Sequence, residues 1–161
     1  MKTGPDSRRK SPINVIRRRK SSHDIFDGTL QKTQLWLNEI MSELDWHDRP
    51  NKAYLALRTV LHALRDRLTV EEAVDLGAQL PMLIRGLYYE GWTLKGKPHK
   101  ERKKADFLEH VKDTFENDYT SRPESITRAV FKTLARHTSK GEIADIKNML
   151  PKPLHELWPA R

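Results

Sequence analysis

The seven histidines have the side chains with the widest range of chemistry in this sequence, because imidazole can bind metal ions or transfer protons near neutral pH. Their spacing matches no zinc site. Two of them adjoin a glutamate, in Glu109-His110 and His155-Glu156, and neighbouring side chains on a helix point roughly 100° apart. We therefore interpret the histidines as surface residues and expect no metal or other cofactor.

A cluster of carboxylates is formed by Glu71, Glu72 and Asp75, and Glu142 with Asp145 repeats part of it. Acidic residues in a first helical turn stabilise the helix through its dipole, which is a sufficient structural account of both groups. The chain has no cysteine, no glycine-rich phosphate loop and no nucleophile elbow. We therefore do not expect an enzyme.

A basic segment at residues 93–105 has a local net charge of +5, because six cations surround the single acid Glu101. Trp92 immediately precedes it and could stack on a base while the cations hold phosphate. The alternative is that Tyr88 packs in the core and Trp92 covers its edge. The six cations are Lys95, Lys97, Lys100, Arg102, Lys103 and Lys104.

The first 22 residues form a second basic cluster, with a net charge of +7 out of the formal +8 of the whole chain. Residues 1–28 are polar and show no sustained apolar period, so we predict a disordered arm. Its cations other than Lys2 are Arg8, Arg9, Lys10, Arg17, Arg18, Arg19 and Lys20.

Such an arm favours a partner with many negative charges. Nucleic acid is our first choice, because clustered cations neutralise phosphates and release counterions. A membrane surface ranks lower, since Val15-Ile16 offers too little apolar area for an anchor. An acidic protein surface on which the arm becomes ordered, or a purely solubilising tail, are the remaining alternatives.

The composition is that of one helical domain, and the absence of cysteine fits a reducing compartment. A length of 161 residues suffices for one core, and seven glycines and 32% charged residues favour helix over sheet. No apolar stretch is long enough to span a membrane or to serve as a signal sequence. We expect a cytoplasmic protein, and the sequence gives no indication of its oligomeric state.

Helical periodicity and end signals predict about eight short helices and no strands. Amphipathic segments cover about 29–46 and 51–67, and Thr69 with Glu72 has the spacing of a capping box. Pro81 suits the first turn of the next helix, and Gly91 suits its end. The second half repeats these signals: a helix is expected near 107–115, two further helices open at Ser121 and Ser139, and a last short helix runs from Pro151 to Trp158.

The two halves of the chain are related by an internal repeat. Shifted by 70 residues, 56–88 aligns with 126–158 without a gap, so that Glu72 meets Glu142 and Tyr88 meets Trp158. Upstream, Trp36 and Leu37 align with Phe107 and Leu108 at a shift of 71. We predict two tandem four-helix repeats, 29–92 and 106–159, joined by the basic linker 93–105 in one domain, 29–161.

The segment ALRTVLHALRDRLTVEEAVDLGAQLPMLIRGLYYEGW, residues 56–92, resembles the bacterial family catalogued as domain of unknown function 2267. The likeness extends over roughly residues 29–159. It implies a small all-helical domain and brings no reaction, cofactor or ligand with it.

Together these observations predict a non-catalytic binding or adaptor protein that contacts nucleic acid or an acidic protein surface through its arm and its basic linker. The alternative is a small enzyme or small-ligand protein that uses the groove between the repeats.

Overall fold

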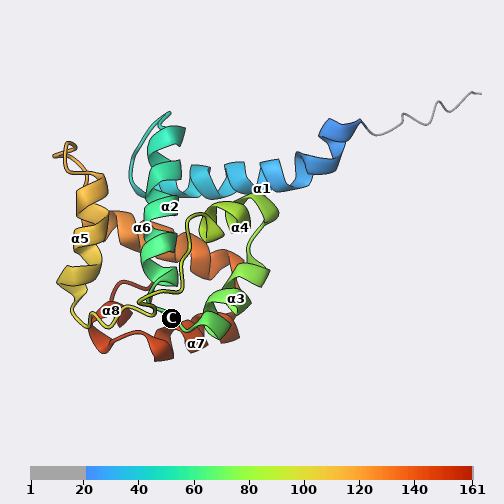
Figure 1. The fold of residues 1–161 in the computed structure, drawn as a ribbon. Helices are drawn as coiled ribbons and strands as arrows, with labels where there is room; N and C mark the ends of the chain where they lie inside the picture. Colours follow the sequence, from blue (N-terminus) through green and yellow to red (C-terminus); the bar gives the residue numbers. More distant parts are fainter. Residues whose placement is uncertain (1–20, 161) are drawn as a thin grey trace, which may run out of the picture.

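The computed structural model describes residues 21–160, and this part of the chain is all-helical, without a strand (Figure 1). The predicted fold class is therefore confirmed. No helix in this range is both long enough and apolar enough to cross a membrane. The helices are α1 (Ser22–Glu43), α2 (Pro50–Arg65), α3 (Val70–Gln79), α4 (Met82–Tyr89), α5 (Lys104–Thr114), α6 (Pro123–His137), α7 (Lys140–Met149) and α8 (Lys152–His155).

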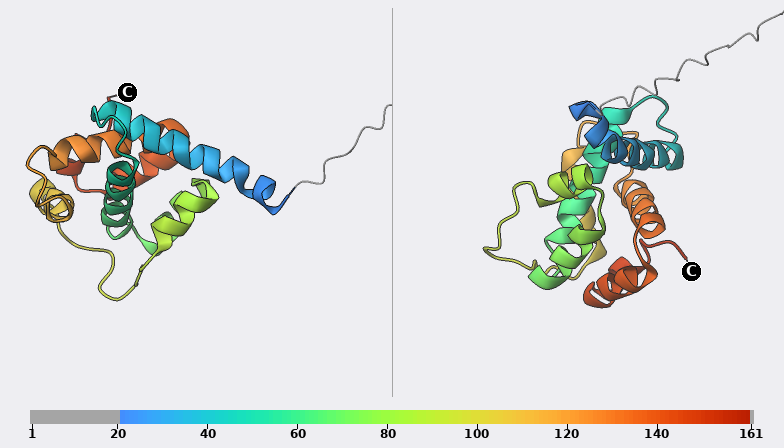
Figure 2. Two further views of the ribbon diagram at one scale, coloured as in Figure 1. Left: turned by 90° about the horizontal axis from the view of Figure 1, so that it is seen from above. Right: turned by 90° about the vertical axis from the view of Figure 1, so that its right-hand side faces the viewer.

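Helix α1 begins at Ser22, several residues before the predicted start near Thr29. The Asp24 carboxylate accepts a hydrogen bond of 2.6 Å from the Ser21 backbone N–H, which satisfies a donor at the helix start. A capping interaction therefore starts the helix upstream of its apolar stripe. Its first turns project past the other helices (Figures 1 and 2), and Ile25 and Phe26 are exposed there. The prediction that 22–28 are disordered was wrong, and residues 1–20 lie outside the described residues.

The four longest helices form the centre of the fold. Helices α1 and α5 each pack against both α2 and α6, and α2 also contacts α6. Their inward positions at helical spacing carry Trp36, Leu57, Leu61, Phe107 and Phe131, all at most 1% exposed. One continuous core thus includes side chains from both halves of the chain.

The short helices lie at the edge of this central group. Helix α3 packs against α4 and α7, and α4 also contacts α1 and α2. Tyr88 of α4 is buried, and its hydroxyl donates to the Ala73 carbonyl of α3 at 2.8 Å. Gly91, with φ of +66°, follows α4, which agrees with its predicted role as a helix stop.

The helix bounds agree with the predicted register. Helices α3 and α7 both have ten residues and start 70 positions apart, after the N-cap residues Thr69 and Ser139. Helix α8 follows Pro151 as α4 follows Pro81, but it has only four residues. The predicted helix to Trp158 was therefore wrong at its end: Leu157 and Trp158 are buried beyond the last helical turn. Two structural repeats remain our interpretation of these bounds.

Candidate functional site

The basic linker divides into exposed and engaged cations. Lys95, Lys100, Arg102 and Lys103 are exposed and have no ion pair with another described residue. Lys97 and Lys104 are half-buried and paired. The linker therefore presents four of its six cations to solvent.

Lys97 is engaged by the C-terminal end of α2. Its Nζ lies 3.0 Å from Asp66 Oδ2 and 2.6 Å from His99 Nε2. Asp66 also accepts a hydrogen bond of 2.9 Å from Arg65 Nε. Burial acts to raise the pKa of Asp66, but hydrogen bonds from Arg65 and Lys97 outweigh it and lower this pKa. The charge of Lys97 thus serves to hold the linker.

Lys104 joins the start of α5 to two other parts of the chain. Its Nζ lies 2.5 Å from a Glu156 carboxylate oxygen and 3.3 Å from one of Glu124 in α6. Hydrogen bonds from Lys104 to Glu156 and Glu124 raise the pKa of its ammonium group. This lysine is a cross-link between elements.

Trp92 packs against its own half of the molecule. Its ring stacks on Tyr89 with 5.6 Å between centroids, and the Arg65 guanidinium lies 6.0 Å from the indole centroid. The indole Nε1–H is buried and has no hydrogen-bond partner within residues 21–160. This placement agrees with the packing alternative, in which Tyr88 is buried and Trp92 covers the neighbouring edge.

The cations predicted for the arm, Arg8, Arg9, Lys10, Arg17, Arg18, Arg19 and Lys20, all lie outside the described residues. Their predicted contact with a partner stays a prediction.

The linker has a fixed path because two further contacts attach it to α2. The backbone N–H of His99 donates to the Asp66 carbonyl at 2.7 Å. Glu101 pairs with Arg67 and lies 3.3 Å from His110 Nε2 of α5. The linker therefore bridges the C-terminal end of α2 and the middle of α5.

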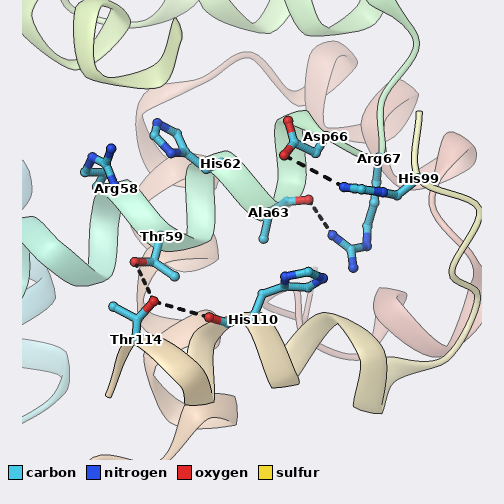
Figure 3. A pocket seen from close by; sticks show the side chains of 9 residues that line it. All are labelled: Arg58, Thr59, His62, Ala63, Asp66, Arg67, His99, His110 and Thr114. Carbon is cyan, nitrogen blue, oxygen red and sulfur yellow. Dashed lines mark hydrogen bonds and ion pairs between the residues drawn. The ribbon is translucent and has the colours of Figure 1, made fainter. Parts of the chain in front are cut away.

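A pocket of about 210 Å³ opens between α2, α5 and this linker (Figure 3). Helix α2 supplies one face through positions four residues apart, while α5 and the linker supply the rest. Ala63 has the smallest side chain among the lining residues, which leaves the hollow beside it. The lining residues are Arg58, Thr59, His62, Ala63, Asp66, Arg67, His99, His110 and Thr114.

The imidazoles in this pocket lie among positive charges. His62 Nε2 lies 2.6 Å from the Leu87 carbonyl, so this nitrogen carries the proton. Burial, and then the charges of Arg65 and Arg58, lower the pKa of His62. Burial, and then Lys97 and Arg67, lower the pKa of His99. Both rings are consequently neutral at neutral pH, in an electropositive setting.

Arg67 is the most deeply buried cation of the pocket, with 2% of its side chain exposed. It donates to the Ala63 carbonyl at 2.8 Å, and its guanidinium lies 4.8 Å from the Phe107 ring centroid. Its Nε–H is buried and has no partner among the described residues. The pocket therefore contains a cation with unused hydrogen-bonding capacity.

Sequence reasoning expected a groove between the repeats but did not identify the residues of this pocket, because it treated the histidines as surface residues and examined α2 for its apolar stripe. The available signal was the polar series Arg58, His62 and Asp66, spaced by four along a helix whose opposite face is apolar. Within residues 21–160, no group of His, Asp or Glu side chains is arranged to hold a metal ion.

Comparison with known proteins identifies a family but no characterised relative. Residues 33–157 match the family described as "Uncharacterized conserved protein (DUF2267)". No curated protein matches the sequence. The matched region contains the pocket and the basic linker and excludes the arm.

Proposed function

We propose that this chain, which belongs to the DUF2267 family, is a non-catalytic binding protein that contacts a polyanion, with nucleic acid as the first candidate. The contact surface consists of the exposed linker cations Lys95, Lys100, Arg102 and Lys103, extended by the basic arm.

The observation that carries this proposal is the state of the linker's charges. Its only acid, Glu101, pairs with Arg67, and the four exposed cations have no ion pair with another described residue. Hydrogen bonds to α2 fix the path of the segment that carries them. A cationic loop whose path is already fixed loses little conformational freedom when it binds phosphates.

The arm supports the same function from the sequence. Exposed cations bind phosphates by releasing counterions, so affinity falls steeply with salt and depends weakly on base sequence. Trp92 is engaged with Tyr89 and Arg65, so we assign it no base-stacking role.

The test is binding of fluorescent duplex and single-stranded oligonucleotides, measured by anisotropy over a range of salt concentrations. We expect the triple variant Lys95→Gln, Lys100→Gln, Lys103→Gln to bind more weakly, with a salt slope smaller by roughly one unit per lysine removed. A chain that begins at Ser22 should lose most of its affinity.

The matched control replaces three exposed lysines elsewhere, Lys32, Lys112 and Lys140, by glutamine. This variant has the same net charge as the linker variant, so equal weakening in both would contradict a localised surface. If the full chain binds no oligonucleotide even at low salt, nucleic acid is excluded and an acidic protein surface becomes the candidate.

A small-ligand function is the second candidate, because the pocket between α2 and α5 lies between the two halves of the chain. Removal of residues 1–21 separates the two functions: it should remove most of the affinity for a polyanion and leave a pocket-based activity intact.

A further inference from the structure

The pocket has a counterpart elsewhere in the molecule, where side chains of the protein fill it. Under the register of the repeat, α6 corresponds to α2 and α1 corresponds to α5. Helix α1 packs against α6, and α5 packs against α2. The α1–α6 contact therefore shows how the same arrangement looks with different side chains.

Two carboxylates occupy the α1–α6 contact. Arg136 Nη1 lies 2.8 Å from a Glu39 carboxylate oxygen, and His137 Nε2 lies 3.0 Å from the other oxygen. Lys132 Nζ lies 2.7 Å from Glu43 Oε1. The basic side chains of α6 are thus neutralised by acids of α1.

The α2–α5 contact lacks these two acids. The 71-residue shift places His110 where α1 has Glu39, and Thr114 where it has Glu43. On the facing helix, the 70-residue shift places Ala63 where α6 has the larger Thr133. An imidazole and a threonine therefore replace the two carboxylates, an alanine replaces the facing threonine, and a pocket lies between the two helices.

The basic character of the facing helix is retained. His62 takes the place of Lys132, and Arg67 takes the place of His137. Asp66 replaces Arg136, but its carboxylate is already engaged by Arg65 and Lys97. The α2–α5 contact thus keeps basic groups, and their carboxylate partners come from outside α5: Glu101 of the linker pairs with Arg67 and His110, and Glu90 lies 3.4 Å from Arg58.

We infer that this pocket binds a small oxyanion, inorganic phosphate or a phosphate monoester, in the place that Glu39 and Glu43 fill in the other half. Arg58, Arg67 and His110 are the lining groups that would donate to it. The buried Nε–H of Arg67 has no partner among the described residues, and the Thr59 and Thr114 hydroxyls lie beside this site (Figure 3). This site does not rest on the proposed polyanion contact of the linker.

The size and chemistry of the pocket fit such a ligand. Its volume of about 210 Å³ is several times the ~30 Å³ that one water molecule takes up in the liquid. Arginine and imidazolium donors form short, strong hydrogen bonds with phosphate oxygens. A bound anion would also offset the positive charges that lower the pKa of His62, so binding should couple to proton uptake.

The experiment is an NMR titration of the histidine ring signals of the full chain with inorganic phosphate, at constant ionic strength. We expect saturable shifts for His62 and His110, and a higher pKa of His62 in the presence of phosphate. The exposed His23 and His47, which lie outside the pocket, should not respond.

Thr114→Glu is the decisive variant, because it restores the carboxylate of the other half without removing a basic group. It should weaken phosphate binding at least about tenfold, since the ligand must compete with a tethered carboxylate. The matched control is Thr120→Glu, an exposed position between α5 and α6, which should bind as the natural chain does. If Thr114→Glu fails to fold, Arg58→Gln provides the second test. Arg58 is partly exposed, and its replacement should also weaken phosphate binding.

The outcomes separate this site from the linker surface. The triple linker variant described above should retain phosphate binding while it loses affinity for oligonucleotides. Tighter binding of methyl phosphate than of inorganic phosphate would identify a monoester as the ligand, and the reverse would identify the free ion. Absence of saturable shifts, or an unchanged affinity in Thr114→Glu and Arg58→Gln, would overturn the inference.

Discussion

At the scale of single residues, Glu72 and Glu142 depart most clearly from their expected role. The Thr69 hydroxyl accepts from the Glu72 backbone N–H at 3.3 Å, as predicted, and Ser139 does the same for Glu142 at 3.2 Å. The carboxylates, however, approach each other between α3 and α7. Burial, and then the charge of Glu142, raise the pKa of Glu72 to about 7.

This pair should make the stability of the protein depend on pH. A carboxyl group with a raised pKa in the folded state stabilises the fold while it is protonated, and this contribution is lost as pH rises toward and through 7. Glu142→Gln removes the repelling charge and supplies a donor for Glu72. We expect this variant to gain on the order of 1–2 kcal/mol at pH 8 and much less at pH 5.

Urea unfolding at the two pH values measures this gain. The neighbouring Glu71→Gln serves as the control, because Glu71 is exposed and should show no such difference between pH 5 and pH 8. An equal effect of Glu142→Gln at both pH values would exclude a charge-repulsion origin.

Residue identity alone could not distinguish the free linker cations from the engaged ones. Lys97 and Lys95 look equivalent in the sequence, but Lys97 meets Asp66, which lies 31 residues away along the chain. The same holds for the capping glutamates: the spacing of Thr69 and Glu72 predicted a cap, but it did not show that the Glu72 carboxylate lies beside Glu142 of α7. Signals from neighbouring residues in the sequence predicted where these side chains lie on the helices and the linker, but not which distant residues they contact.

At the scale of elements, the α3–α4 contact depends on a glycine. A Cβ at Gly77 would lie 2.1 Å from the Tyr89 hydroxyl oxygen and 2.6 Å from its Cζ. Gly86 in α4 has open space around the same position. The two glycines therefore have opposite roles, although both lie within helices.

We expect Gly86→Ala to stabilise the protein by roughly 0.5–1 kcal/mol, because alanine restricts the unfolded chain and favours helix. Gly77→Ala should destabilise it by roughly 1–3 kcal/mol, since Tyr89 must move away from α3 and from its stack on Trp92. Thermal unfolding of both variants measures the difference. Stabilisation by both would show that Tyr89 moves without cost.

Most helices could be predicted because their boundaries depend on local signals. Prolines, N-cap residues and apolar periodicity located α2 to α7 within a few residues. The two misses lie at the ends of the described range. Helix α1 starts on the Ser21–Asp24 cap ahead of its apolar stripe, while packing of Leu157 and Trp158 continues after α8 has ended.

At the scale of the whole molecule, the two halves share their core. Trp36 of α1 stacks on His137 of α6 with 5.2 Å between centroids. Phe131 of α6 lies 5.9 Å from Phe107 and 4.1 Å from Trp158 within the second half, and α6 in turn packs against α1 and α2 of the first half. The sequence repeat predicted a shared core. It did not predict the pocket, because the pocket forms where residues differ between the repeats, and only the packing of α5 on α2 shows which of these differences face each other.

Because each half covers the other, neither should fold alone. A chain that ends at Lys95 exposes the face of α1 that contacts α6, and a chain that starts at Gly96 exposes the face of α6 that contacts α1 and α2. Buried apolar surface contributes about 25 cal/mol per Å², and a domain is stable by only about 5–15 kcal/mol, so the loss of this burial should unfold each fragment. We expect each fragment to show weak helicity by circular dichroism and no cooperative unfolding, and their mixture to recover the helicity of the full chain. Cooperative unfolding of the 1–95 fragment by itself would show that one four-helix half is an independent domain and that the shared core is not required for folding.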